Sequence, residues 1–275
     1  MKKENSFLYI FCIGLSIFLC KVLFPLIFHN IQSTIVSVLA TGIGEILGVL
    51  LPGYFILGRL NNNIYHNNSK ITSSHIIISI ILIGILSFAS KLFFDGIQLI
   101  RLGASNDFNL INIRNKLDLV NILFYSLMIA LLPAVCEEYL YRYLSYKYIK
   151  KNLYILVSAS LFTFAHIGNI NFLYLFILGA YLAYIYQIYR SYIIIVILHT
   201  VYNLIQLIFD KIFFLPSDTI NVSLKYETGL DAINAGIQYL GESFFVLGII
   251  LFFFFTLKKS KKINNKEETE IISLL

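Results

Sequence analysis

Eight apolar stretches, most of them close to 20 residues long, dominate this sequence of 275 residues. A helix needs about 20 apolar residues to cross the hydrocarbon core of a bilayer, and buried strands are much shorter. We predict spans at residues 7–28, 35–57, 75–93, 119–149, 153–167, 171–189, 191–213 and 235–257. The expected fold class is therefore all-α: a polytopic membrane protein with about eight transmembrane helices.

The composition agrees with a membrane protein and excludes other classes. Hydrophobic residues make up 58% of the chain and charged residues only 13%, whereas soluble domains are about half apolar and about a quarter charged. This excludes a disordered chain and argues against an ordinary cytosolic enzyme. The net charge of +6 requires no nucleic-acid partner, because membrane proteins concentrate Lys and Arg on cytoplasmic loops. We expect the lipid bilayer as a partner and no nucleic acid.

The distribution of Lys and Arg predicts the orientation. If the N-terminus lies inside, the inside segments carry 14 of these residues and the outside segments carry six. This bias predicts that both termini are cytoplasmic. A composition rich in Ile, Asn, Lys and Tyr fits an AT-rich genome, and the expected location is a bacterial plasma membrane.

Three clusters of polar residues lie inside predicted spans. An ionisable group within a span is costly, so each cluster is a functional hypothesis by default. The clusters are Glu137-Glu138-xxx-Arg142 in span 119–149, Phe162-xxx-His166 in span 153–167 and His199-xxx-Asn203 in span 191–213.

Helix geometry predicts that these clusters meet. Glu137 and His166 lie 14.5 positions on either side of a pivot between Lys151 and Asn152, in a tight basic turn, which places both about 22 Å from the turn in a helical hairpin. His199 and Asn203 lie about 14 and about 20 Å beyond the start of their span. Three separate stretches of sequence thus converge on one depth.

The spacing also predicts which side chains face the cavity. Glu138 and Arg142 are four residues apart and can form an ion pair, with Glu137 turned about 100° away on the same helix. His199 and Asn203 share one face of their helix. Glu45, among Gly42, Gly44 and Gly48, either pairs with a buried cation or lines a cavity.

This set of side chains suits hydrolysis of an amide bond. A carboxylate in apolar surroundings can act as a general base. Water is the molecule that it would deprotonate here, because the clusters contain no convincing nucleophilic Ser or Cys with a base beside it. His166 would share the proton or orient the water, and His199 and Asn203 would donate to an oxyanion. A metal alternative stays open, since Glu137, His166 and His199 are also a possible set of zinc ligands. The expected cofactor is therefore none or zinc.

Together the three motifs resemble those of the CPBP (Abi) family, which comprises type II CAAX prenyl endopeptidases and their relatives that process bacteriocins. The family pattern is EExxxR, then FxxxH, then HxxxN or HxxxB, in that order, and all three are intact here. The resemblance covers about residues 117–213. It implies a division into residues 1–116 (three helices and a loop), residues 117–213 (the catalytic core, four helices) and residues 214–275 (the last helix and a basic tail).

The resemblance implies an intramembrane endopeptidase, or metalloprotease, acting on a peptide or protein substrate in the membrane. It implies that Glu137 and His166 activate water and that His199 and Asn203 stabilise the oxyanion. It implies support of the site by Glu138 and Arg142. Nothing in the sequence requires a prenylated substrate.

Two other functions remain as alternatives. One is a non-catalytic protein of bacteriocin self-immunity, or a scaffold that binds a partner through its helices. The other is a transporter or proton relay, although the inverted repeats that transporters show are not evident. Residues 94–118, which mix apolar and charged residues, are expected to form an external interfacial helix or loop, or a substrate gate.

Overall fold

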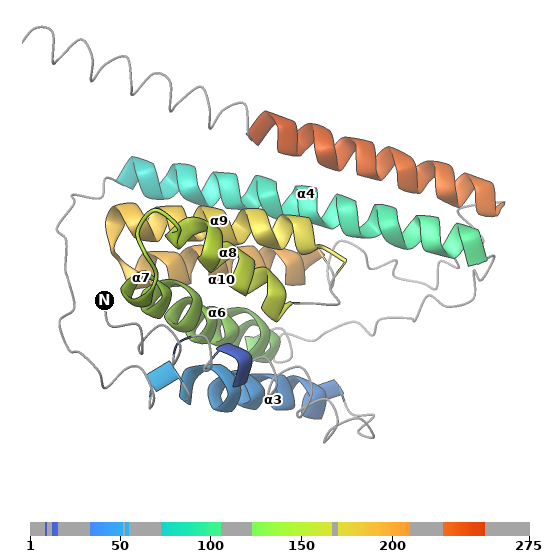
Figure 1. Cartoon of the computed structure of the whole chain (residues 1–275). Helices are drawn as coiled ribbons and strands as arrows, with labels where there is room; N and C mark the ends of the chain where they lie inside the picture. The colour runs from blue at the N-terminus through green and yellow to red at the C-terminus, as the bar shows by residue number, and fades with distance from the viewer. Residues whose placement is uncertain are drawn as a thin grey trace, which may run out of the picture. The chain divides into compact units, whose positions relative to one another are not determined.

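The chain folds into helices throughout the part that the computed structural model describes (Figure 1). The described residues are 9, 13–15, 34–51, 53–54, 73–105, 123–166, 170–209 and 228–250. Within these ranges no strand occurs, which agrees with the predicted all-α class.

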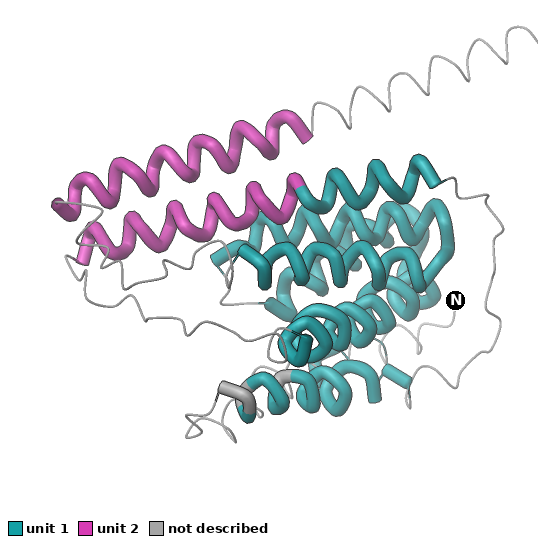
Figure 2. The backbone as a smooth tube through the Cα atoms, turned by 180° about the vertical axis from the view of Figure 1, so that it is seen from behind, with its two compact units in different colours: residues 1–84, 112–219 teal, residues 85–111, 220–275 magenta. Residues whose placement is uncertain are grey.

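Two compact units make up the chain (Figure 2). The first contains residues 1–84 and 112–219, and the second contains residues 85–111 and 220–275. The predicted division by chain order, at residues 116 and 213, stays a prediction.

The first unit holds the helices that carry the polar clusters. Its elements are α3 (Thr34–Glu45), η2 (Ile46–Leu50), η6 (Ser126–Leu131), α6 (Leu132–Glu138), η7 (Tyr139–Leu144), α7 (Ser145–Tyr148), α8 (Tyr154–Ala165), α9 (Phe172–Tyr189) and α10 (Tyr192–Ile208), together with the first part of α4 (Ser73–Ser105). The helix formed by residues 123–148 packs against α3 on one side and α10 on another, and α8 packs along α9.

Four of the described helices are long and apolar enough to cross a membrane: Ser73–Ser105, Leu123–Tyr148, Phe172–Tyr189 and Gly229–Ile250. Three shorter apolar helices are Val38–Leu50, Tyr154–Ala165 and Tyr192–Ile208. Eight transmembrane helices are therefore not confirmed, and most of the predicted span 7–28 lies outside the described residues. The apolar helices indicate a membrane protein.

The third predicted span is longer than expected. It was predicted over residues 75–93, with an external segment from residue 94, but α4 continues without a break to Ser105. The charged residues do not end the helix, because Asp95, the first of them after residue 93, is paired within the helix. Lys91 Nζ lies 2.5 Å from Oδ1 of Asp95, one turn further along. A pair at this spacing supports a helix rather than ending it.

The helix Leu123–Tyr148 is not regular along its length. Two π-helical segments, η6 and η7, flank the seven residues of α6. Such wide turns are rare and are frequent at functional sites. They place Glu137 and Glu138 at the end of a short α-helical segment between two irregular ones.

The hairpin of α8 and α9 depends on a close approach at Gly179. A Cβ atom there would lie 3.1 Å from Cα of Ala159 and 3.2 Å from Cδ1 of Phe162. The missing side chain therefore lets α9 pack directly on the part of α8 that carries Phe162.

Only two residues join α9 to α10. Arg190 takes the left-handed conformation with φ 54°, and its Nε donates to the carbonyl of Gln187 at 2.9 Å. Ser191 then caps α10 by accepting from the backbone N–H of Ile194. This tight turn makes the two helices antiparallel neighbours and fixes how deep His199 lies.

In the second unit, the later part of α4 lies against the helix Gly229–Ile250 with almost no side chain between the backbones. A Cβ atom on Gly96 would lie 2.8 Å from the carbonyl oxygen of Gly236, and one on Gly103 would lie 2.4 Å from that of Gly229. One heptad from Gly236, Ser243 Oγ donates to the carbonyl of Ala89 at 2.8 Å. Small residues at seven-residue intervals thus allow the close packing that is common between membrane helices.

Candidate active site

Side chains from other segments fix the helix that carries Glu137 and Glu138. The hydroxyl of Tyr192 donates to the carbonyl of Val135 at 2.5 Å, and Ser158 Oγ donates to the carbonyl of Tyr141 at 2.6 Å. The hydroxyl of Tyr9 donates to the carbonyl of Leu140 at 3.1 Å. A buried carbonyl needs a partner, and these hydroxyls supply one where the π-helical turn changes the regular pattern. The result is a helix held in place from several sides.

A charged group of three residues lies beside the cavity. Arg142 Nη1 lies 2.9 Å from Glu138 Oε1, and both side chains are fully buried. The same oxygen lies 2.7 Å from His199 Nδ1. Because a carboxylate only accepts, Nδ1 of His199 carries the hydrogen and donates it. Glu138 therefore holds the His199 ring in one orientation and neutralises Arg142.

His166 is held in the same tautomer by a different partner. Its Nδ1 lies 2.9 Å from the carbonyl oxygen of Phe162, and a carbonyl only accepts, so Nδ1 is the donor. His166 is the C-cap residue of α8 and directly follows its last helical residue. The bond to the preceding turn leaves Nε2 of His166 directed away from its own helix.

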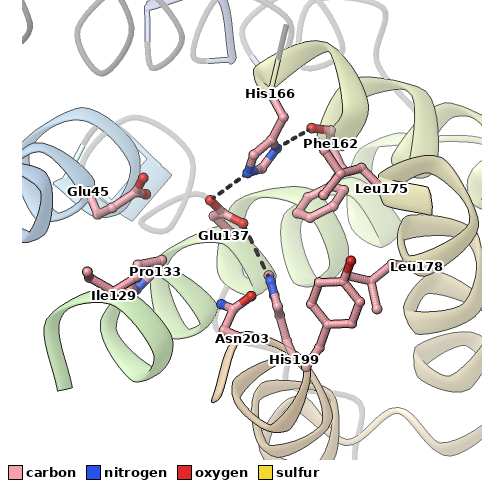
Figure 3. A pocket seen from close by; sticks show the side chains of 11 residues that line it. Glu45, Ile129, Pro133, Glu137, Phe162, His166, Leu175, Leu178, His199 and Asn203 are labelled. Atoms are coloured by element: carbon pink, nitrogen blue, oxygen red, sulfur yellow. Dashed lines mark hydrogen bonds and ion pairs between the residues drawn. The ribbon is translucent and has the colours of Figure 1, made fainter. Parts of the chain in front are cut away.

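Glu137 lies between the two imidazole rings (Figure 3). Its Oε1 is 3.5 Å from Nε2 of His166, and its Oε2 is 3.8 Å from Nε2 of His199. Both rings carry a hydrogen on Nδ1, so a neutral ring presents a bare Nε2 to the carboxylate and a protonated ring presents an N–H. Glu137 and the two Nε2 atoms thus converge on one small region, and a group with O–H donors fits between Glu137 and His166.

Phe162 contacts most of the polar group. Its ring lies 4.2 Å from the guanidinium carbon of Arg142, and its centroid is 4.7 Å from that of His166 and 5.6 Å from that of His199. The face of an aromatic ring attracts a cation, and the ring fills space that water would otherwise enter. This explains the need for an aromatic residue four positions before His166.

Asn203 comes from the same face of α10 as His199. Its Nδ2 donates to the carbonyl of Ala130 at 3.3 Å, in the π-helical segment η6. One N–H of the amide remains for another acceptor, because an amide nitrogen has two donors. Asn203 is thereby fixed against the helix that carries Glu137.

These residues line one cavity of about 200 Å³. Its lining is made of acidic, imidazole, amide, phenol and apolar side chains: Glu45, Ile129, Pro133, Glu137, Phe162, His166, Leu175, Leu178, His199, Tyr202 and Asn203. The volume is below the roughly 300–1,000 Å³ of a typical small-molecule pocket. It is therefore too small for a folded segment of a substrate.

The four residues expected to carry the chemistry are all brought to this cavity: Glu137, His166, His199 and Asn203. Glu138 and Arg142 lie behind it, paired with each other. Of the two alternatives for Glu45, lining the cavity agrees with its position. The supporting hydroxyls of Tyr192 and Ser158 were not identified from the sequence, because Tyr and Ser are ordinary residues in apolar helices and nothing in the spacing marks them.

The metal alternative does not fit the residues as they are placed. In the part of the chain that the structure describes, no group of three His, Cys, Asp or Glu side chains is arranged to hold a metal ion, and this includes Glu137 with His166 and His199. We therefore derive no step through a metal.

The fold and the site define a class: a membrane protein of apolar helices with a buried glutamate between two histidines. A family model described as type II CAAX prenyl endopeptidase Rce1-like matches residues 119–205, about a third of the chain. This confirms, for that segment, the family predicted from the motifs, and supports a CAAX-type protease at the family level. No curated protein and no solved structure matches the chain.

Proposed function

We propose that this protein is an intramembrane endopeptidase that hydrolyses a peptide bond of a membrane-associated or exported peptide. One observation carries the proposal: the Glu137 carboxylate lies between Nε2 of His166, at 3.5 Å, and Nε2 of His199, at 3.8 Å, in a cavity among apolar helices. The match of residues 119–205 to a family of endopeptidases supports it.

In the first step, Glu137 and His166 activate a water molecule. The carboxylate oxygen and the bare Nε2 are both acceptors, and a water about 2.8 Å from each would donate one O–H to each. This leaves a lone pair of the water oxygen for the substrate carbonyl carbon. As the C–O bond forms, the proton of the water passes to Glu137, acting as general base.

In the same step, the carbonyl oxygen of the substrate becomes an oxyanion. Asn203 has one amide N–H left for it, and His199 lies on the same face of α10. Because Nδ1 of His199 donates to Glu138, Nε2 can donate only when the ring carries both protons. His199 therefore acts as an imidazolium in this role, held by the carboxylate of Glu138. Fixed donors of this kind stabilise a developing charge without reorganisation.

In the second step, the tetrahedral intermediate collapses and the C–N bond breaks. Glu137 returns the proton to the leaving nitrogen, which departs as an amine, and the other product is a carboxylic acid that ionises. No covalent intermediate on the protein is required. Glu138 and Arg142 stay paired throughout and hold the ring of His199 in place.

The proposal includes the location of the protein. It lies in a bacterial plasma membrane with both termini in the cytoplasm, where peptides that are being exported can reach the cavity.

The test is cleavage of a broad peptide library by the purified protein in nanodiscs, with Glu137→Gln as the variant. Glutamine keeps the size of the side chain but cannot accept the proton, so we expect the rate to fall by at least about 10³-fold. Glu242→Gln is the matched control, because Glu242 is exposed on the helix Gly229–Ile250, where it accepts a hydrogen bond from Gln238. Equal cleavage by wild type and Glu137→Gln contradicts the proposal. No cleavage by wild type across the library favours a non-catalytic immunity protein or scaffold.

A further inference from the structure

Glu45 is a second carboxylate at the cavity that the proposed reaction does not use. It is the last residue of α3, and it lines the cavity together with Glu137, His166 and His199. It lies outside residues 119–205, the segment that matches the endopeptidase family. Its position is therefore a feature that the match does not account for.

Two glycines hold the segment of Glu45 close to the helix that carries Glu137. A Cβ atom on Gly42 would lie 2.9 Å from Sδ of Met128 and 3.2 Å from Cδ2 of Leu132. Beyond Glu45, one on Gly53 would lie 3.3 Å from Leu144 and from Tyr139. The segment is thus packed tightly both before and after Glu45, which holds its backbone close to the cavity.

The cavity has two chemically different sides. Figure 3 shows Glu45 on one side, Leu175 and Leu178 on the other, and Glu137 between them. Among the described residues that line the cavity, the ionisable groups are two carboxylates, two imidazoles and one phenol, and none is Lys or Arg. The lining therefore has a carboxylate on one side, together with the apolar Ile129 and Pro133, and two leucines on the other.

We propose that Glu45 binds a Lys or Arg side chain of the substrate, next to the peptide bond that is cleaved. A carboxylate in surroundings of low dielectric interacts strongly with a cation, and charge-assisted hydrogen bonds are the stronger kind. The apolar side takes an aliphatic or aromatic residue on the other side of that bond. This inference rests on the proposed endopeptidase function and names its substrate class: peptides with a basic residue beside an apolar one.

The test uses pairs of N-acetylated peptides that differ at one position, with Lys in one and norleucine in the other, so that length is kept and charge is lost. For the position that reaches Glu45, wild-type protein should cleave the Lys peptide with a kcat/KM about tenfold higher, the size of effect that one charged hydrogen bond gives. In Glu45→Gln this ratio should fall to about one, and in Glu45→Lys a Glu peptide should be preferred. Glu242→Gln is the control and should keep the wild-type ratio.

A ratio that stays near tenfold in Glu45→Gln overturns the inference, and so does a wild-type ratio near one at every position. If no peptide is cleaved, the proposed function fails by itself, and binding then decides the inference. The Kd values of the Lys and norleucine peptides are measured with Glu137→Gln protein in nanodiscs, with and without Glu45→Gln. Tighter binding of the Lys peptide that depends on Glu45 supports the inference, and equal binding overturns it.

Discussion

At the residue scale, Glu138 interacts with two other polar residues of the site. Its Oε1 lies 2.9 Å from Nη1 of Arg142 in an ion pair and accepts from Nδ1 of His199 at 2.7 Å, and its side chain is fully buried. Removing one member of a buried ion pair leaves an uncompensated charge, which costs about 3–5 kcal/mol, whereas removing both is often far milder.

This predicts strong coupling between Glu138 and Arg142. Arg142→Met alone should lower the free energy of unfolding by about 3 kcal/mol or more, because the Glu138 carboxylate stays buried without its guanidinium. Glu138→Gln combined with Arg142→Met should recover at least about 1 kcal/mol of that loss, while cleavage stays impaired because His199 loses its charged partner. Chemical denaturation of the protein in micelles measures all three variants. Additive losses in the double variant would mean that the pair is not coupled.

Some residue roles could be predicted from the sequence and others could not. The spacing of Glu137, His166, His199 and Asn203 predicted one common depth, and the structure places all four around one cavity; their catalytic roles stay a prediction. The tautomers of the two histidines could not be predicted, because they depend on the carbonyl of Phe162 and on Glu138 in the folded protein.

Charged residues were predictable only in part. The ion pair of Glu138 and Arg142 was predicted from their spacing, but the contact of the guanidinium with the ring of Phe162 was not. The pair of the buried Lys91 with Asp95 was not predicted at all. Whether a charge in an apolar helix meets a partner or water depends on tertiary packing, which one helix does not reveal.

At the element scale, the helix pair of the second unit rests on glycine. Gly236→Ala should weaken this pair, because the added Cβ would lie 2.6 Å from the carbonyl oxygen of Gly96. We expect a loss of about 1–3 kcal/mol in stability, as for overpacking of a tight interface.

Gly241→Ala is the matched control on the same helix. Nothing lies within 4 Å of the position that its Cβ would take, so the higher helix propensity of alanine should give no loss and up to about 1 kcal/mol of gain. Thermal unfolding of both variants in the same detergent measures the difference. Equal stability of the two would contradict the close packing at Gly96.

Element type was predictable, but element ends and irregular turns were not. The fourth predicted span, 119–149, agrees closely with the helix Leu123–Tyr148, because a long apolar run has few alternatives. The π-helical segments η6 and η7 within it were not predicted. In η7, hydroxyls of Tyr9 and Ser158 from other segments donate to the carbonyls of Leu140 and Tyr141, and the local sequence does not indicate these contacts.

At the scale of the whole molecule, the predicted orientation is open to direct test. The bias of Lys and Arg predicts both termini in the cytoplasm. Epitope tags at the two ends should resist added protease in intact cells and be removed in inside-out vesicles, in proportion to a known cytoplasmic marker. Removal of either tag in intact cells would contradict this orientation.

The number of spans shows what apolar length can and cannot establish. Four described helices are long enough to cross a membrane, and Tyr154–Ala165 and Tyr192–Ile208 are apolar but shorter. The second of these carries His199 and Asn203, so a helix can shape the site without the length of a complete span. The lengths of the apolar stretches predicted the class of protein, and the packing of the helices determined the site.

The central claim is that Glu137, with His166, activates water directly. The most direct measurement is cleavage of a peptide library in nanodiscs by wild type and by Glu137→Gln, each with and without a metal chelator. The account predicts that cleavage by wild type is the same with the chelator and is lost in Glu137→Gln. Cleavage that persists in Glu137→Gln, or that the chelator abolishes in wild type, would contradict it.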